Sequence, residues 1–412
     1  MGNNPDPGRV PMLTMDEAIT IIKANHPARQ VEEIPLEQAL GRHLAREVRA
    51  VEPSPRYTNS AMDGFAVRWA DVAGCNQDPV TLTLIGESQA GIPFAGELTS
   101  GEAIRISTGA MLPASADTVV RVEDTSDQGS RVVIHTCGRQ HQDVRFLGEE
   151  IAEGDLLLEQ GCGLFPPQIA LLAAQGIERV EVFTRPRVAL VVTGSELVAD
   201  GQPAPHQIRD SNRVMLRAAI AQAGGDLVHA AWAGDEYAMT VATLGKAMGQ
   251  AQLIICSGGV SVGQHDHVRQ AAQELGFAEL FWRVRQKPGK PLYCGRANDT
   301  LLFGLPGNPV SAFMCFFYYI QPLIASLAGE EFSWQRLTAR AACDITNRGK
   351  RTTMVTIRLS RDQEGRPLFL PAGSQGSHRL TSIAQAHGFV IVPAQTTLPA
   401  ASRQELYLFP WR

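Results

Sequence analysis

Four short turns rich in glycine and proline carry the residues best suited to bind an anion. The turns are residues 193–196, 257–263, 287–291 and 304–309. The first two directly follow apolar runs typical of buried strands, and helical spacing resumes after the second. A strand, a glycine-rich turn and a helix N-terminus together present backbone N–H groups to a phosphate. The turns therefore predict one site for a phosphate-rich ligand, although a tight strand-to-helix connection explains any single turn equally well.

Two lysines stand in the third turn, Lys287-Pro288-Gly289-Lys290-Pro291. The prolines restrict the backbone, so less conformational entropy is lost when the turn orders around a ligand. Two ammonium groups held in this way suit a phosphate or another tetrahedral anion, and a solvated charged turn is the competing interpretation. The second turn has neither the Gly-Lys-Ser/Thr ending of a Walker loop nor the GxGxxG of a dinucleotide fold, so neither site is predicted.

Three carboxylates, Glu196, Asp235 and Asp266, fall at the carboxyl ends of predicted strands or at the start of the next helix. Each one alone is most simply a helix N-cap. Three carboxylates on one rim would repel one another unless a cation or a proton lay between them. Mg²⁺ bound by one or two carboxylates and substrate phosphate would remove this repulsion, so a magnesium site is predicted. Zinc is not predicted, because His265 and His267 flank Asp266 and consecutive side chains diverge.

Asp63 and Thr108 are polar residues in two further turns, Asn-Ser-Ala-Met-Asp-Gly and Ser-Thr-Gly-Ala. A carboxylate before glycine and a hydroxyl on a turn are ordinary turn residues. Taken alone, neither residue indicates a function.

From residue 187 the sequence alternates between strand and helix patterns. Apolar runs are followed by segments with helical spacing, and Gly224 and Gly225 end the first of these helices. The alternation predicts a three-layer parallel α/β domain, in which ligands bind beyond the carboxyl ends of the strands, where the four turns fall. The predicted elements are strands 188–192, 227–232 and 253–256, helices 212–223 and 236–248, and a helix capped by Asp266.

The remaining segments predict three other domains. Thr14 and Glu17 form a capping box before a helix with an apolar face, and strands with frequent turns follow residue 50. Five strands are predicted near the C-terminus, at 338–345, 352–360, 366–370, 388–393 and 405–409. The expected division is a mixed N-terminal domain (12–49 and 146–186), an inserted β-rich domain (50–145), the α/β domain (187–330) and a C-terminal β domain (331–412).

Composition and charge exclude several classes of protein. The 412 residues carry a net charge of -5, whereas broad nucleic-acid binding needs a basic surface. Seven cysteines form no CxxC pair and the N-terminus lacks a signal-peptide pattern, so a reduced, cytoplasmic protein is expected. The apolar stretch 310–329 contains Gln321 and Pro322 and is expected to be a core helix and not a membrane span.

Taken together and in this order, the motifs resemble the molybdopterin molybdenumtransferase family, which includes bacterial MoeA and the E-domain of gephyrin. The matching stretches are 59–66, 107–110, 193–197, 210–213, 257–266, 287–291, 304–311 and 375–378. The resemblance implies a multidomain α/β plus β fold, with a three-layer, MogA-like molybdopterin-binding domain, a β-rich inserted domain and a C-terminal β-barrel. It also implies a homodimer whose cleft lies between the α/β domain of one subunit and the inserted domain of the other.

The same resemblance implies an enzyme that takes adenylylated molybdopterin and molybdate, releases AMP and places the metal on the dithiolene with the help of Mg²⁺. The implied catalytic residues are Asp63, Thr108, Glu196, Lys287 and Lys290. The implied substrate-binding residues are Ser257, Gly258, Gly259, Ser261, Gly263, Gly307, Asn308, Pro309 and Ser377. The implied metal ligands are Asp235, Asp266 and Glu196. A molybdopterin adenylyltransferase and recipient molybdoenzymes are candidate partners.

The sequence departs from the family pattern at a few positions. Ser195 and Gln264 stand where acidic residues are usual, which removes two carboxylates and predicts weaker or altered metal dependence. Arg283 stands where some members have lysine. Thr356 stands where arginine is frequent, and Arg358, two residues along the same strand face, is the candidate substitute.

Two other classes of protein remain open. An enzyme that adenylylates molybdopterin, or one that acts on nicotinamide nucleotides, would share the turns at 257–263 and 304–309 but would lack the inserted domain with Asp63 and Thr108. A gephyrin-like dimeric scaffold would share the whole fold, although nothing in the sequence resembles a linker or a second partner domain.

Overall fold

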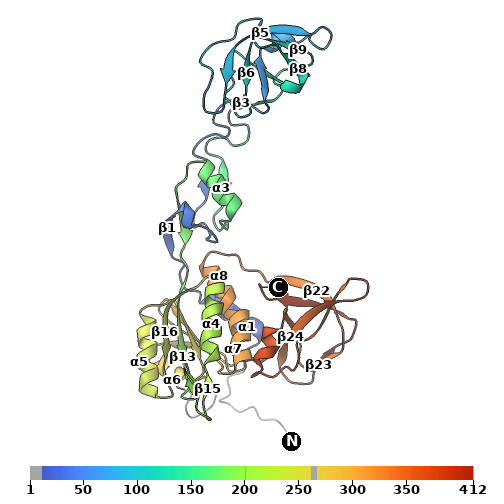
Figure 1. Cartoon of the computed structure of the whole chain (residues 1–412). Helices are drawn as coiled ribbons and strands as arrows, with labels where there is room; N and C mark the ends of the chain where they lie inside the picture. The colour runs from blue at the N-terminus through green and yellow to red at the C-terminus, as the bar shows by residue number, and fades with distance from the viewer. Residues whose placement is uncertain (1–11, 200, 261–266, 412) are drawn as a thin grey trace. The chain divides into compact units, whose positions relative to one another are not determined.

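The computed structural model describes residues 12–199, 201–260 and 267–411 (Figure 1). The chain divides into two compact units. Unit 1 comprises Met1–Ala45, Gly161–Leu164 and Arg179–Arg412, and unit 2 comprises Arg46–Gln160 and Phe165–Glu178. Unit 2 is therefore an insertion in the sequence of unit 1.

A six-stranded sheet forms the centre of the α/β part of unit 1. Its order is β16 (Asp226–Trp232), β13 (Arg187–Val192), β17 (Leu253–Ser257), β21 (Thr300–Leu305), β20 (Tyr293–Ala297) and β18 (Ala278–Trp282). The first four strands are parallel, as predicted, whereas β20 and β18 are antiparallel to their neighbours. The antiparallel strands were not predicted. The β20–β21 pair is antiparallel because only Asn298 and Asp299 join the two strands, and so short a turn permits only an antiparallel neighbour.

Helices cover both faces of this sheet and make three layers (Figure 1). The core on one face contains Val188, Leu190 and Val192 of β13 with residues of α4 (Ser211–Gln222), α7 (Pro309–Cys315) and α8 (Gln321–Leu327). The core on the other face contains Ala189 and Val191 with residues of α5 (Tyr237–Met248) and α6 (Val268–Glu274). Alternate side chains of one strand thus enter two cores, as the pleat requires. The predicted three-layer α/β fold is confirmed. Asp266, the predicted cap of α6, lies outside the described residues.

The apolar segment Pro309–Leu327 is a buried helix of unit 1. It consists of α7, a π-helical stretch η3 (Phe316–Ile320) and α8. The helix is 19 residues long and is apolar enough by length and composition to cross a membrane, but 89% of its most apolar window is buried inside the protein. Phe313 and Phe317 contact Phe409 near the C-terminus through ring–ring packing. The segment is a core helix, as expected.

The C-terminal strands close into a barrel. Their order is β24 (Thr352–Arg361), β25 (Pro367–Pro371), β22 (Arg336–Ala341), β28 (Arg403–Leu408) and β26 (Gly388–Val392), and β26 pairs back with β24. Ile357, Phe369 and Leu406 are buried in its core. The smaller elements are α9 (Leu380–Ala384), β23 (Ile345–Asn347) and β27 (Thr396–Leu398), and β23 pairs with β27. The strand β19 (Gln286–Lys287) adds in parallel to β24, which joins the lysine turn to the barrel.

The N-terminal part of unit 1 contains α1 (Met15–Ala24) and the predicted capping box. Glu17 N–H donates to Thr14 Oγ1 at 3.2 Å, and Thr14 N–H donates to Glu17 Oε2 at 2.7 Å. Next come β1 (Val31–Pro35) and the short η1 (Leu36–Gln38), and β1 pairs with β12 (Arg179–Phe183). A small ladder of β14 (Leu197–Val198) and β15 (Ile208–Arg209) lies before α4 in the sequence.

Unit 2 is built around a second six-stranded sheet. Its order is β7 (Thr118–Arg121), β4 (Gly64–Val67), β6 (Glu102–Ile106), β5 (Val80–Ser88), β9 (Arg131–Ile134) and β8 (Thr125–Asp127). Phe65, Leu82, Val120 and Ile134 are buried in its core. The other elements are β2 (Val48–Arg49) paired with β11 (Leu156–Leu158), β3 (Asn59–Ser60) paired with β10 (Val144–Arg145), α2 (Trp69–Val72), η2 (Val122–Asp124) and α3 (Pro166–Ala174). The β-rich insertion and the fold class are confirmed, while the finer domain boundaries stay a prediction.

Candidate active site

Three of the predicted turns meet at the carboxyl ends of β13, β17 and β21. Ser257 is buried, and its Oγ accepts a hydrogen bond from Asn212 Nδ2 at 2.9 Å. The same nitrogen donates to Gly307 O at 2.7 Å, so one amide ties two turns together. Gly258 has a φ of 95°, and a Cβ there would lie 2.6 Å from Thr193 Oγ1, so the turn requires glycine.

Two predicted carboxylates line a cavity of about 310 Å³ at these strand ends, here called the carboxylate cavity. Its lining residues are Thr193, Gly194, Glu196, Asp235, Gly258, Gly259, Val260, Pro291, Pro306, Gly307 and Asn308. Glu196 and Asp235 are thus brought together, as predicted. In the described part of the chain, no group of three or more His, Cys, Asp or Glu residues could hold a metal ion. Two carboxylates still fit Mg²⁺, which commonly takes one or two carboxylates and completes its shell with water and phosphate.

Ser195 explains how one of these carboxylates is held. Its backbone N–H donates to Asp235 Oδ2 at 2.8 Å, and its hydroxyl donates to the same oxygen. An aspartate at position 195 would keep the backbone N–H but has no hydroxyl proton to donate, and its carboxylate would repel Asp235. The departure from the family pattern therefore fixes the orientation of Asp235 while it removes a negative charge from the rim.

A second cavity, of about 430 Å³, is lined by cationic and neutral polar side chains and is here called the basic cavity. Lys287, Lys290 and Arg351 supply the positive charge, and none of its lining residues is acidic. Ser311, Thr353, Thr356, Gln375, Ser377, His378 and Ser382 supply hydroxyl, amide and imidazole groups. The lysines come from the turn beside β19 and Ser377 from the C-terminal part of the same chain. An excess of positive charge with polar donors suits a tetrahedral dianion.

The lysine turn is held from inside the core. Gln286 is fully buried, and its Nε2 donates to Gly289 O at 3.1 Å. Its Oε1 accepts a hydrogen bond from the Tyr319 hydroxyl, which lies in the buried π-helical stretch. Burial raises the pKa of Tyr319 well above its ordinary value, so the hydroxyl keeps its proton and remains a donor. The two lysines are therefore presented by a turn anchored to the core helix.

A third cavity, of about 590 Å³, connects the other two through shared residues and is here called the bridging cavity. It shares Thr193, Glu196, Gly307 and Asn308 with the carboxylate cavity, and His378 with the basic cavity. Asn212 also lines it. Asn212 Oδ1 is buried and accepts no hydrogen bond from the described residues. Such an acceptor is costly to leave unpaired, and a water or a donor from a ligand in this cavity would satisfy it.

Asp63 and Thr108 lie together in unit 2. Asp63 Oδ1 accepts hydrogen bonds from the Thr108 backbone N–H at 2.7 Å and from the Thr108 hydroxyl at 2.9 Å. These bonds, the backbone one first, hold the pKa of the exposed Asp63 carboxyl below its ordinary value. Among the described residues, Asp63 Oδ2 accepts no hydrogen bond, so this oxygen is available to a substrate or its proton. The two residues therefore form one pair, although neither indicated a function by itself.

The predicted site residues fall into three groups. Those in unit 1 that are described line the three cavities, and Asp63 and Thr108 are paired in unit 2. Ser261, Gly263 and Asp266 lie outside the described residues, as does Gln264. The catalytic, binding and metal roles of all these residues stay predictions.

Sequence reasoning missed Arg351, and the structure does not place Arg358, the candidate substitute, in the basic cavity. Arg351 precedes β24 at the end that pairs with β19, so it reaches the basic cavity beside Lys287. Arg358 is exposed and pairs in register with Leu370 of β25, farther along the strand, so it does not line that cavity. No local pattern distinguishes the two arginines. Asn212 lies in a stretch that matched the family, but only its contacts with Ser257 and Gly307 indicate a role.

Comparisons with known families cover nearly all of the described chain. The MoeA N-terminal region (domain I and II) matches residues 13–176. A probable molybdopterin binding domain matches residues 189–326, and the MoeA C-terminal region (domain IV) matches residues 338–402. The three matches follow the order expected from the motifs.

Individual relatives show the same similarity. The molybdopterin molybdenumtransferase of Haemophilus influenzae is 33% identical over 387 residues, 92% of this chain and 94% of that protein. Molybdopterin molybdenumtransferase 2 of Mycobacterium tuberculosis is 36% identical over 383 residues, 90% of this chain and 93% of that protein. The crystal structure of the molybdopterin biosynthesis MoeA protein from Pyrococcus horikosii has a TM-score of 0.83 and 30% identity, covering 97% of this chain and 99% of that one. The chain therefore belongs to the molybdopterin molybdenumtransferase family.

Proposed function

We propose that this protein inserts molybdate into adenylylated molybdopterin and releases AMP, which completes the molybdenum cofactor. The observation that carries the proposal is the juxtaposition of unlike cavities in unit 1. A cavity with three cationic side chains and no acidic ones is connected, through shared residues, to a cavity with two carboxylates. A substrate with several phosphates and a separate oxyanion needs both kinds of surroundings. The names and extents of the relatives support this reaction.

The organic substrate is assigned to the turns at the strand ends. Backbone N–H groups around Gly259 and Gly307 bind phosphate oxygens, because a glycine turn lets the ligand approach the main chain closely. The Gly258 N–H already donates to Leu305 O at 3.0 Å. The pterin, which carries several N–H donors, is placed in the bridging cavity, where Asn212 Oδ1 accepts one of them. The buried amide then discriminates against ligands that lack a donor.

Molybdate is assigned to the basic cavity. Lys287, Lys290 and Arg351 offset the repulsion between a dianion and a substrate that already carries phosphates. The two lysines lie on an anchored turn, so little reorganisation is needed as charge moves during the reaction. The dithiolene sulfurs of the substrate are the ligands of the metal, and no protein nucleophile is required.

Glu196 and Asp235 are the residues proposed to hold Mg²⁺. When bound, the ion would neutralise charge that develops on the phosphate oxygens as the bond to AMP breaks. Ser195 keeps Asp235 oriented for this role and leaves its second oxygen for the ion. Two carboxylates are too few protein ligands to bind Mg²⁺ tightly by themselves. The affinity for free Mg²⁺ is therefore expected to be weak.

The proposal includes a homodimer in the cytoplasm, with a molybdopterin adenylyltransferase and recipient molybdoenzymes as partners. Seven cysteines remain unpaired, five of them buried, which suits a reducing compartment. In this homodimer, Asp63 of the partner subunit acts on the substrate that the turns of this chain bind. That arrangement would give the Asp63–Thr108 pair its role.

The direct test is release of AMP from adenylylated molybdopterin by the purified protein, with and without molybdate and Mg²⁺. Molybdate-dependent release, lost in Lys287→Ala and kept in Lys246→Ala, is the expected result. Lys246 is a matched control because it is an exposed lysine on α5, away from the three cavities. Consumption of ATP with unmodified molybdopterin would identify an adenylyltransferase instead, and binding without release would indicate a scaffold or carrier.

A mixing experiment tests the shared site. Asp63→Ala and Lys287→Ala proteins are each expected to be inactive. A mixed dimer would contain one complete site. When the two folded variants are mixed and exchange subunits, molybdate-dependent AMP release should therefore be restored. If mixed dimers form and remain inactive, the site does not combine residues of two subunits.

A further inference from the structure

The loop that carries Asp63 is held by three separate segments of unit 2. The loop runs from β3 to β4, and Ser60 lies fully buried at its start. The first holding segment follows β6: Gly109 N–H donates to Ser60 O at 2.8 Å, and Thr108 donates to the Asp63 carboxylate. The second follows β7: Val122 N–H donates to Asp63 O at 3.3 Å. The third precedes β10: Asp143 O accepts the Ala61 N–H at 2.8 Å.

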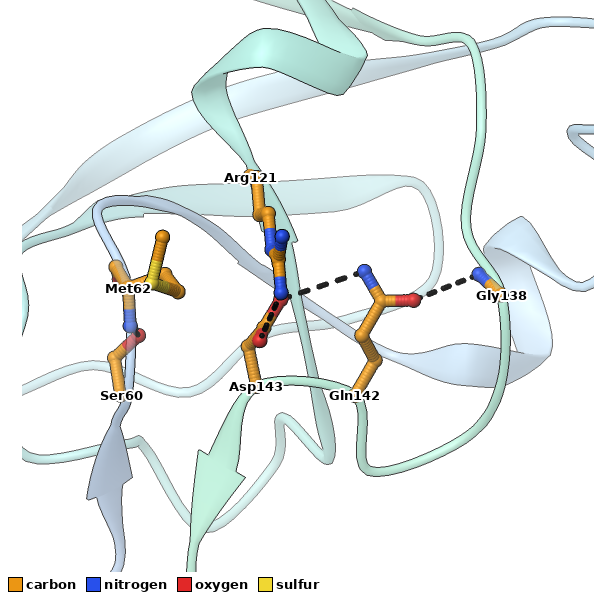
Figure 2. Close-up of polar contacts among 6 residues, drawn as sticks. All are labelled: Ser60, Met62, Arg121, Gly138, Gln142 and Asp143. Carbon is orange, nitrogen blue, oxygen red and sulfur yellow. Dashed lines mark hydrogen bonds and ion pairs between the residues drawn. The ribbon is translucent and has the colours of Figure 1, made fainter.

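An ion pair joins the second and third of these segments. Arg121 is the last residue of β7, next to Val122, and its guanidinium faces the Asp143 carboxylate (Figure 2). Arg121 Nε donates to Oδ2 at 2.8 Å and Nη2 donates to Oδ1 at 2.9 Å, a two-point contact. The fork geometry fixes orientation as well as distance. The ion pair thus connects Arg121, which lies next to the anchoring residue Val122, to Asp143, which is itself an anchoring residue.

Asp143 needs this support because its backbone is unusual. Its φ is 51°, in the left-handed region that residues other than glycine seldom adopt. Gln142 helps to hold the segment, since its Oε1 accepts the Gly138 N–H at 2.8 Å and its Nε2 lies 3.5 Å from Asp143 Oδ2 (Figure 2). The Asp143 carboxylate is mostly buried, at 12% exposure, while Arg121 is 46% exposed. An uncommon backbone conformation and a fixed side chain together place the Asp143 carbonyl that accepts the Ala61 N–H.

We propose that Arg121 and Asp143 are positioning residues for Asp63: their ion pair keeps the Ser60–Asp63 loop in place, so that the Asp63 carboxylate stays bonded to Thr108 and presents its second oxygen to the substrate. The inference rests on the proposed function for the role of Asp63. Neither residue of the pair touches the substrate in this scheme. Their effect on the reaction passes through Asp63.

The competing explanation is that the pair only stabilises unit 2. A partly exposed ion pair contributes little to folding, so its loss should lower the unfolding midpoint by no more than about 3 °C. A displaced catalytic group is more costly for the reaction, and a shift of about 1 Å can slow it by about a hundredfold. If the pair positions Asp63, its loss should lower kcat strongly and the unfolding midpoint only slightly. If the pair only stabilises unit 2, kcat should change as little as the unfolding midpoint does.

The experiment compares Arg121→Met, Arg121→Lys and Asp143→Asn in the full-length protein. Arg121→Met removes both the positive charge and the two-point contact with Asp143. It should lower kcat for AMP release at least about tenfold with little change in KM. Arg121→Lys keeps the charge without the fork and should retain intermediate activity. Asp143→Asn, which tolerates the left-handed backbone, should also be intermediate. Arg105→Met is the matched control, because Arg105 forms an ion pair with Asp127 in the same sheet and should leave kcat unchanged.

Coupling to Asp63 gives the decisive comparison. If Arg121 acts through Asp63, the double variant Arg121→Met/Asp63→Asn should be no slower than Asp63→Asn alone. Multiplied effects, or an unchanged kcat in Arg121→Met, would overturn the proposal. An equal loss in Arg105→Met would also overturn it, because the effect would then belong to the unit as a whole.

A readout without activity separates this inference from the proposed function. Amide hydrogen exchange should be faster at Ala61 and Thr108 in Arg121→Met and unchanged there in Arg105→Met. If the wild-type protein releases no AMP but this exchange pattern is found, the function is wrong and the positioning contact remains. If AMP is released and these amides are unaffected in Arg121→Met, the positioning inference is wrong.

Discussion

Asp63 in unit 2 and Asp235 in unit 1 are held by the same kind of hydrogen-bond pattern on different scaffolds. In each case one carboxylate oxygen accepts both the backbone N–H and the hydroxyl of a single residue, Thr108 or Ser195. Ser195 and Asp235 each lie three residues beyond the paired ends of neighbouring parallel strands, Val192 and Trp232. Asp63 instead precedes a strand, and Thr108 follows its antiparallel neighbour, with Gly64 opposite Ile106.

The difference teaches how much each arrangement depends on distant side chains. Parallel strands bring their carboxyl ends to one edge, so the sheet order alone brings the segments that carry Ser195 and Asp235 together. The Asp63 loop lies between short strands and relies on Arg121, Asp143 and the Thr108 segment for its position. Strand order positions the Ser195–Asp235 pair, whereas contacts with neighbouring segments position the Asp63–Thr108 pair.

The largest expected effect distinguishes the two carboxylates by their chemistry. Asp63→Ala should lower kcat for AMP release by about a hundredfold or more, because it removes a charged group from the reacting atoms. Asp235→Ala should act on the metal site, so a high Mg²⁺ concentration should recover part of its activity. Rate measurements across a Mg²⁺ titration compare them. Equal recovery of both variants would show that the two pairs do the same task.

A second prediction concerns Ser195. Ser195→Asp adds a carboxylate beside Asp235, and their mutual repulsion favours a bound cation. The Mg²⁺ concentration that gives half-maximal AMP release should fall by about tenfold, at the cost of lower stability without the ion. Unfolding followed with and without Mg²⁺ would supply the second measurement. An unchanged Mg²⁺ requirement would contradict the assignment of the carboxylate cavity to the metal.

Glycine substitutions next to the two pairs should differ in stability. Gly258 and Gly109 have φ values of 95° and 79°, so alanine is strained at both. A Cβ at Gly258 meets Thr193 at 2.6 Å, whereas nothing lies within 4 Å of one at Gly109. Gly258→Ala should therefore destabilise by about 3 kcal/mol and Gly109→Ala by about 1 kcal/mol. Urea unfolding checks this, and a larger loss at Gly109 would show that the Asp63 pair is the more tightly packed.

The smallest expected effect is a shift in pH dependence. The Thr108 hydrogen bonds lower the pKa of Asp63, so its carboxylate stays charged to lower pH than usual. Thr108→Val keeps the backbone N–H and loses only the hydroxyl, so the pKa of Asp63 should rise part of the way back. In the pH profile of kcat, the acidic limb should move to higher pH, and the plateau at neutral pH should stay nearly unchanged. A limb that stayed in place would show that another group controls it.

The sequence predicted those parts of the molecule that local patterns encode. The glycine turns that follow apolar runs identified Gly258 and Gly307, because neighbouring residues determine where a strand ends and a turn begins. It did not predict Arg351 or the role of Asn212, since these depend on the β19–β24 pairing and on contacts across 95 residues between Asn212 and Gly307. The antiparallel strands and the Arg121–Asp143 pair were missed for the same reason. Long-range side-chain contacts leave no periodic signal.

The position of the apolar helix in the chain has a consequence for protein synthesis. The strands of the sheet that covers Pro309–Leu327 end at Leu305, so all of them leave the ribosome before this segment does. The nascent helix therefore meets a sheet that can already bury one of its faces, and downstream residues cover the rest. The aromatic residues that complete its packing, among them Trp334, Phe389 and Phe409, are made later. The order of synthesis thus limits the time during which a membrane-like segment is exposed to the translocation machinery and to aggregation.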